Sequence, residues 1–179
     1  MSIYIHVCLF LSLYVTLVVN VVKQSDYSMS DDWHLTIYSR KKQMVLGILV
    51  NRIVKTSPEW AAQYRRNIFA HEILPNAPYL LFVFPDKLYL WRKSEITTEE
   101  TLPNYNIDAH PIFQPYFQRS KVTPEKIRSQ SLELIVISWL ADIMYSESPS
   151  SLSKSQKWVV ESRLFTAISQ GKFAIEEVA

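Results

Sequence analysis

Hydrophobic and polar residues alternate with a period of two in the segment DWHLTIYS, residues 32–39. This pattern is typical of a strand that buries one face. After the charged turn RKKQ, the segment MVLGILVNRIV is apolar almost throughout, which indicates a strand buried on both faces. The sequence therefore predicts two consecutive strands, over 32–39 and 44–54.

A helix is predicted directly after the second strand. Either Thr56 or Ser57 can cap it, Pro58 suits its first turn, and Glu59 is favourable at the positive end of the helix dipole. Helical spacing places four apolar residues on one face: Trp60, Ala61, Tyr64 and Ile68.

The rest of the chain continues with strands and then helices. The pattern predicts a hairpin over 79–93, an acidic loop over 94–104, and a short strand and a short helix within 105–119. A long helix should follow from Thr123 to Tyr145. After a linker over 146–155, we expect a last helix that ends at Gly171, with this glycine as a left-handed cap. This order indicates an α/β (α+β) fold in which a mixed central sheet is flanked by helices and the C-terminal part is helical.

The composition excludes several function classes. Only two glycines occur in 179 residues, which argues against a phosphate-cradling loop or a dinucleotide-binding unit, and so against a small-molecule cofactor. The lone cysteine, Cys8, rules out an internal disulfide and a cysteine-based zinc site. The four histidines form no metalloprotease-like pair, and no Gly-x-Ser-x-Gly motif is present. No metal site is predicted from these residues.

The first segment, residues 3–22, contains twenty residues without Asp, Glu, Lys or Arg. Three interpretations fit it: a membrane anchor, an artefactual or remnant segment with translation starting at Met29, or buried core. It lacks the preceding positive charge and the following cleavage site of a signal peptide. Lys23 directly follows the segment, so an inserted segment would leave the folded part in the cytoplasm.

The net charge is only +2, but the charges are unevenly distributed. Between Arg40 and Arg66 the chain has one acid, Glu59, and a block of basic residues: Arg40, Lys41, Lys42, Arg52, Lys55, Arg65 and Arg66. Arg65 and Arg66 fall toward the polar face of the predicted helix. A basic block on one strand–helix unit indicates either a solvated face or a surface that meets phosphates.

Four segments carry a resemblance to a known group of proteins: TSPEWAAQYRRNIFAH, APYLLFVFPDKLYLW, YNIDAHPIFQPYF and SQSLELIVISWL. Together they resemble an uncharacterised cyanobacterial-type family whose core is similar to the PD-(D/E)XK, or restriction-endonuclease-like, nucleases. The resemblance covers roughly residues 43–179. After the hydrophobic segment 1–28, the resemblance implies a nuclease-like α/β core over 29–121 and C-terminal helices packed on that core over 122–179.

The resemblance also implies where a metal site would lie. Such nucleases hold Mg²⁺ with an Asp at the start of one strand and a Glu on the next, and a Lys two residues after the Glu positions the attacking water. Here Asp32, or alternatively Asp31, takes the Asp position, while Leu49 and Asn51 stand at the Glu and Lys positions. Gln63 matches a glutamine that the following helix often supplies. Asp32 and Gln63 are thus the remnant catalytic positions.

These observations predict a nuclease-like protein that is catalytically inactive and binds DNA or RNA through Arg52, Lys55, Arg65 and Arg66. One alternative is an active Mg²⁺-dependent nuclease in which Glu59 or Glu72 supplies the missing carboxylate. Another is a membrane-tethered interaction protein that uses residues 3–22. The expected location is the cytoplasm, with or without a membrane anchor.

Overall fold

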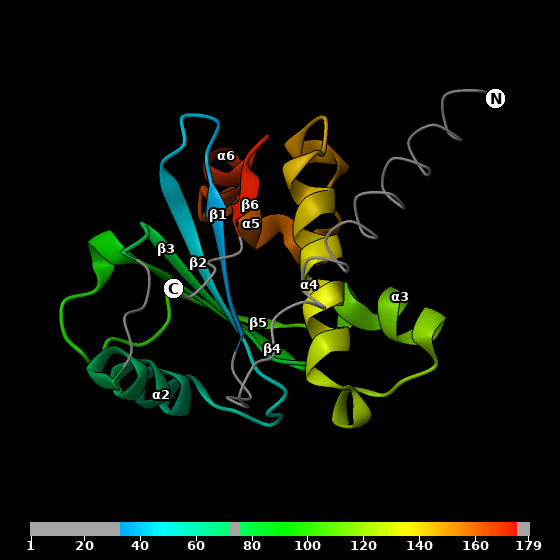
Figure 1. Ribbon diagram of the computed structural model, residues 1–179, viewed down its shortest axis with the longest axis horizontal. Coiled ribbons are helices and arrows are strands. Elements are labelled where there is room, and N and C mark those ends of the chain that lie inside the picture. The colour runs from blue at the N-terminus through cyan, green and yellow to red at the C-terminus, as the bar shows by residue number, and fades with distance from the viewer. Residues whose placement is uncertain (1–32, 72–75, 175–179) are drawn as a thin grey trace. The chain divides into compact units, whose positions relative to one another are not determined.

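A mixed sheet of six strands, in the order β5-β4-β3-β2-β1-β6, organises the part of the chain that the structure describes (Figure 1). The computed structural model describes residues 33–71 and 76–174, which belong to one compact unit. The strands are β1 (Trp33–Tyr38), β2 (Met44–Val50), β3 (Tyr79–Val83), β4 (Lys87–Arg92), β5 (Tyr105–Asp108) and β6 (Lys172–Ala174). The predicted α+β class is confirmed.

One crossover determines the topology of the sheet. β2 runs parallel to β3, and the helix α2 (Pro58–His71) connects them, whereas every other neighbouring pair is antiparallel. Parallel neighbours need such a crossover because the chain must return to the same end of the sheet. As a result, β2 and β3 both begin at one edge, called here the amino edge, and both end at the other, called here the carboxyl edge.

Helices cover both faces of the sheet, as Figure 1 shows for α2 and α4. Within residues 33–71 and 76–174, the helices besides α2 are α3 (His110–Ser120), α4 (Ser129–Met144), α5 (Lys157–Glu161) and α6 (Leu164–Ile168). The same residues form four short 3-10 turns, η1 (Lys93–Glu95), η2 (Pro124–Lys126), η3 (Pro149–Ser151) and η4 (Lys154–Gln156). Alternate residues of the strands divide between two cores. Leu49, Phe82 and Trp91 form one core with α2, while Ile48, Val83 and Leu90 join the larger one with α3 to α6.

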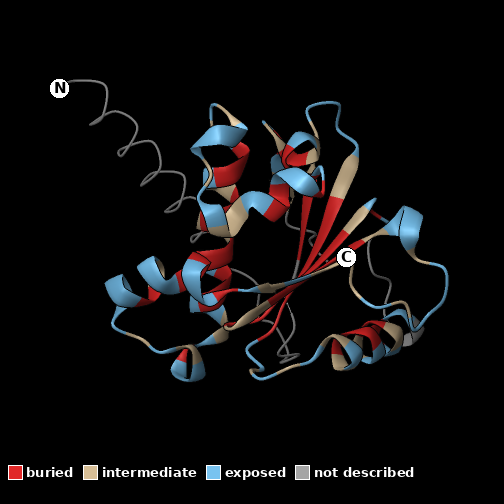
Figure 2. Ribbon diagram, turned by 180° about the vertical axis from the view of Figure 1, so that it is seen from behind, coloured by how far each residue is buried: buried red, intermediate tan, exposed pale blue. Residues whose placement is uncertain are grey.

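The buried residues of this arrangement lie in the strands and on the inner sides of the helices (Figure 2). α4 contributes most to the larger core because its middle is apolar nearly all round, as the sequence predicted, with Val136, Trp139, Leu140 and Met144 all at most 1% exposed. Ile143 lies beside them. The helix begins at Ser129, later than expected, because the first turn after Thr123 is the separate 3-10 turn η2.

Two other predicted boundaries are wrong. The second strand ends at Val50 instead of continuing to residue 54, because the side chain of Asn51 accepts a hydrogen bond from the Ile53 N–H and starts a turn. The last helix is divided into α5 and α6 at Arg163, which has a left-handed φ of 64°.

The end of the chain also differs from the prediction. Gly171 is not the left-handed cap; Gln170 has the positive φ, 54°, and Gly171 leads into β6, which the sequence did not predict. A Cβ atom on Gly171 would lie 2.6 Å from the Tyr38 carbonyl oxygen and 2.8 Å from that of Ile168. Glycine is thus required here for close approach of backbones, and that approach brings β6 beside β1.

Several predictions fall outside the described residues: the segment 3–22, the start at Met29, and the carboxylates Asp31, Asp32 and Glu72. Within 33–71 and 76–174, no helix is both long and apolar enough to cross a membrane.

We expect Gly171→Ala to lower the free energy of unfolding by about 2 kcal/mol, because the backbone atoms that the new methyl meets cannot move aside without shifting β1 or α6. Urea denaturation measures this. Gln170→Gly is the matched control. Glycine removes the strain of a left-handed backbone at this position but adds backbone entropy to the unfolded chain, so the free energy of unfolding should change little. Equal stability of the Gly171→Ala variant and the wild type would contradict the close approach.

Glu133 provides a prediction about pH. It lies in α4 with 4% of its surface exposed, and burial raises the pKa of its carboxyl from 4.5 to about 7. Between these values the unfolded chain has released the proton and the folded chain has kept it, so the free energy of unfolding should fall as pH rises from about 4.5 to 7. Glu133→Gln should remove this contribution to the pH dependence of the free energy of unfolding.

The measurement is urea denaturation of both proteins at several pH values. The stability of Glu133→Gln relative to the wild type should increase across this range, while the exposed Glu161→Gln serves as control. A constant difference between Glu133→Gln and wild type would show that the carboxyl does not titrate in this way.

Candidate nucleic-acid interface

The strand positions that the resemblance assigns to metal binding are occupied by structural residues. Leu49 is 0% exposed and packs in the core beneath α2. Asn51, 5% exposed, donates from Nδ2 to the Tyr64 hydroxyl at 3.3 Å and accepts from the Ile53 N–H at 2.9 Å. One side chain fills the apolar core, and the other ties the end of β2 to α2.

The turn between β2 and α2 is held by hydrogen bonds to the β3–β4 hairpin. The Lys55 N–H donates to Oδ2 of Asp86 at 2.8 Å, which holds Lys55 at a left-handed φ of 61°. The Tyr89 hydroxyl donates to the Thr56 carbonyl at 2.9 Å, and burial raises the pKa of Tyr89. Of the two predicted caps, Ser57 is the one that caps α2, because its Oγ accepts a hydrogen bond from the Trp60 N–H at 3.2 Å.

The carboxyl edge carries charges of both signs. Nδ1 of His110 lies 2.8 Å from Oδ1 of Asp108, and this hydrogen bond lowers the pKa of Asp108. Glu59, exposed at the start of α2, has its pKa lowered by a backbone hydrogen bond and by Ser57. In the described part of the chain, no group of three or more His, Cys, Asp or Glu residues is arranged to hold a metal ion. Asp32 lies outside that part, so its predicted role stays a prediction.

The predicted nucleic-acid-binding residues are not brought together. Arg52 and Lys55 are exposed at the carboxyl edge, and Gln63 is exposed on α2. Arg66 pairs with Glu100 at 2.9 Å. The expectation that Arg65 lies on the polar face beside Arg66 is wrong, because Arg65 is 4% exposed.

Arg65 instead attaches a loop to α2. Its Nη2 donates to the carbonyl oxygens of Thr98 at 3.2 Å and Glu99 at 2.7 Å, and its guanidinium lies over the Trp91 ring, 5.6 Å from the centroid. Burial lowers the pKa of Arg65, and the charge of Glu99 partly offsets this. Arg65 therefore holds the acidic loop against α2 and Trp91.

Basic residues from four distant segments lie along the amino edge. The β1–β2 turn lies there, since Tyr38 pairs with Met44, and β6 brings Lys172 opposite Tyr38. β4 ends there, since Arg92 pairs with Tyr79, and the Tyr79 hydroxyl donates to the Ser162 carbonyl at 3.2 Å, next to Arg163. We call the resulting set the basic edge: Arg40, Lys41, Lys42, Arg92, Lys93, Arg163 and Lys172.

Most of the basic edge is exposed and unpaired. All its members except Arg92 are exposed, and Arg92 forms an ion pair with Glu95. Among the described residues the other six have no carboxylate within ion-pair distance. The predicted basic block is divided between the two ends of β2. This strand has seven residues of about 3.3 Å each, so it separates Arg40 to Lys42 from Arg52 and Lys55 by about 20 Å.

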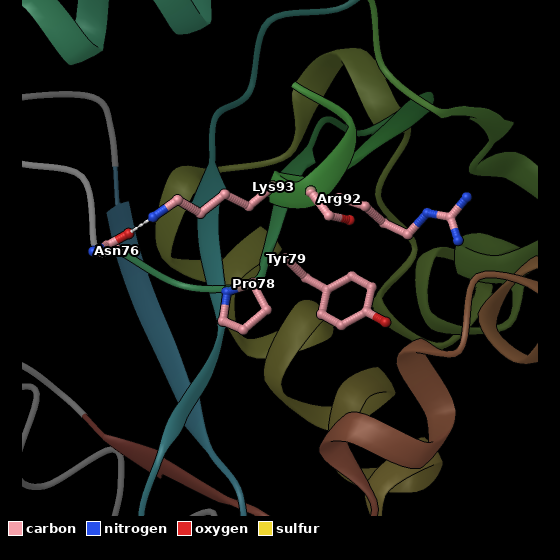
Figure 3. A pocket seen from close by; sticks show the side chains of 6 residues that line it. Asn76, Pro78, Tyr79, Arg92 and Lys93 are labelled. Carbon is pink, nitrogen blue, oxygen red and sulfur yellow. Dashed lines mark hydrogen bonds between the residues drawn. The ribbon is translucent and has the colours of Figure 1, made fainter. Parts of the chain in front are cut away.

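A pocket of about 540 Å³ opens at the basic edge, lined by Asn76, Pro78, Tyr79, Arg92, Lys93 and Ser94 (Figure 3). Figure 3 shows the side chains of Lys93 and Arg92 extending in opposite directions, with Lys93 directed at Oδ1 of Asn76 and the Tyr79 ring below Arg92. The pocket thus presents cationic and amide donors on either side of a tyrosine ring.

Sequence reasoning missed Arg92, Lys93, Arg163 and Lys172 as part of one surface. The signal that could have found two of them is the hairpin, whose second strand was predicted to end near residue 93. Lys172 had no such signal because a three-residue strand after Gly171 leaves no periodic pattern. Comparison of the chain with family models, curated proteins and solved structures gave no match.

The two neighbouring arginines of α2 allow a matched test. Arg65→Met should lower the free energy of unfolding by about 2 kcal/mol, because it removes charge-assisted hydrogen bonds from a buried guanidinium to two loop carbonyls. Arg66→Met should cost less than about 1 kcal/mol, because its ion pair with Glu100 is exposed. Urea denaturation of both variants measures the difference, and equal losses would show that Arg65 does not anchor the loop.

Proposed function

We propose that this protein is a non-catalytic nucleic-acid-binding protein with a nuclease-like core, and that the basic edge contacts the phosphate backbone. The observation that carries the proposal is the presence, along one edge, of six exposed basic residues from four segments, none of which has an ion pair within the described part of a chain whose net charge is only +2. Phosphate contacts by Lys and Arg supply most of the affinity of binding that does not depend on sequence.

The distribution of acids supports this choice of surface. At the carboxyl edge, Asp86, Asp108 and Glu125 accompany the basic residues, so a polyanion would meet repulsion there. Glu95 lies at the basic edge, where it forms an ion pair with Arg92. A phosphate chain is therefore attracted to the amino edge more than to the end where Arg52 and Lys55 lie.

The unit of β1, β2, α2 and β3 supports the nuclease-like part of the proposal. An antiparallel strand pair followed by a crossover helix and a parallel strand is the order in which the resemblance places its catalytic strand and helix. The Glu position of that strand is the buried Leu49, and the Lys position is Asn51, whose amide is used within the fold. A strand so occupied offers neither a metal ligand nor a positioned cation.

Binding to labelled single-stranded DNA, double-stranded DNA and RNA can be measured by fluorescence anisotropy between 50 and 200 mM salt. We expect the affinity to fall at least tenfold over this range, as it does when several phosphates are contacted. Lys41→Glu combined with Lys93→Glu should weaken binding about tenfold at low salt. It should also reduce the slope of log affinity against log salt concentration by about 2, because two phosphate contacts are lost.

The control is Lys126→Glu combined with Lys154→Glu, which changes the charge by the same amount on exposed residues outside the basic edge. This pair should change affinity less than about twofold. Equal losses for the two double variants, or binding insensitive to salt, would contradict the proposed interface. Cleavage of the same DNA or RNA with Mg²⁺, abolished by Asp32→Ala, would instead show an active nuclease.

A further inference from the structure

A second pocket, of about 370 Å³, lies between α3, α4 and the turns η3 and η4. Its volume is at the lower end of the range, about 300 to 1,000 Å³, that small-molecule sites occupy. The apolar part of its lining comes from Pro111, Ile112, Pro115, Ile143 and Leu152. None of its lining residues belongs to the basic edge, so this pocket is separate from the proposed interface.

Two opposite charges line the pocket without neutralising each other. Asp142 accepts a hydrogen bond from the Tyr116 hydroxyl on Oδ2 at 2.9 Å, while the Arg119 guanidinium lies over the Tyr116 ring, 5.3 Å from its centroid. No ion pair joins Arg119 to a carboxylate among the described residues. The tyrosine thus holds a cation on its ring face and an anion at its hydroxyl.

The tyrosine is itself fixed in its neutral form. Burial raises its pKa, and the charge of Asp142 and the hydrogen bond to it raise the pKa further. Tyr116 therefore remains a donor to Asp142 at neutral pH and leaves Oδ1 of that carboxylate able to accept from a ligand. This hydrogen bond also joins α3, which carries Arg119, to α4, which carries Asp142.

The wall of the pocket contains two further unmatched groups. Trp139 is 1% exposed, and its indole N–H has no hydrogen-bond partner among the described residues, which is costly for a buried donor. Pro115 stands inside α3 and has no N–H, so the carbonyl of Pro111 lacks its usual helical donor. A few polar groups beside apolar walls are typical of a site that orients a ligand, and here Arg119 and Asp142 are the polar groups that carry charge.

We propose that this pocket binds a small zwitterion of the α-amino acid class with an apolar side chain. Its carboxylate would accept from Arg119, and its ammonium group would donate to Asp142. The apolar side chain would contact Ile112, Ile143 and Leu152. A neutral heterocycle matches this lining less well, because it would leave the charges of Arg119 and Asp142 without counter-charges.

The experiment is an NMR chemical-shift titration of the full chain with three probes: L-leucine, leucinol, which lacks the carboxylate, and isocaproate, which lacks the amine. We expect saturable binding of L-leucine with a Kd on the order of 1 mM, as for a small weak ligand. Leucinol and isocaproate should bind at least tenfold more weakly.

Two variants identify the groups that recognise each end. Arg119→Gln should weaken binding of L-leucine about tenfold and leave leucinol unchanged, and Asp142→Asn should weaken L-leucine and leave isocaproate unchanged. Arg128→Gln and Glu161→Gln are the matched controls, since both residues are exposed and outside the pocket lining. Both pocket residues are exposed, so neither variant removes core packing.

Three results would overturn the proposal. The first is the absence of saturable shifts with L-leucine at 20 mM, and the second is equal weakening of all three probes by each pocket variant. The third is tighter binding of adenosine than of L-leucine, which would assign the pocket to a heterocycle. Because none of these residues is in the basic edge, failure here leaves the nucleic-acid proposal unaffected.

Discussion

The parallel pairing of β2 with β3 is the constraint on which the rest of the arrangement depends. It forces α2 across one face of the sheet, leaves the other face for α3 to α6, and gives the sheet two chemically different edges. Antiparallel hairpins on either side then return the chain to these edges. The β1–β2 turn and the end of β4 fall at the amino edge, whereas Asp86 and Asp108 fall at the carboxyl edge.

Polar residues around α2 are used chiefly to hold the fold together. Arg65 donates to two loop carbonyls, Asn51 bridges β2 to Tyr64, and Tyr89 reaches the backbone of Thr56. Each satisfies a polar group that would otherwise be buried without a partner, which is a strong requirement inside a fold. The polar side chains at the end of β2 and on α2 are in this way committed to contacts within the fold.

The two proposed sites differ in how they would recognise a ligand. The basic edge consists of long, exposed side chains from separate segments, which suits a polyanion whose charges are spread over many ångströms. The pocket beside α3 has a cation over the ring of Tyr116 and an anion at its hydroxyl, which suits a small molecule that carries both charges. Binding at the basic edge would depend on the number of charges, and binding in the pocket would depend on where its two charges lie.

The sequence by itself determined the kinds and order of most elements. Alternation predicted β1, the apolar run with its capped turn predicted β2 and α2, and the run of apolar residues after Thr123 predicted α4, because these signals are local. The tertiary structure alone decided the burial of Arg65, the role of Gly171, the strand β6 and the gathering of the basic edge. Those features arise from contacts between residues far apart in the chain, such as Arg65 with Glu99 and Gly171 with Tyr38, and no local pattern encodes them.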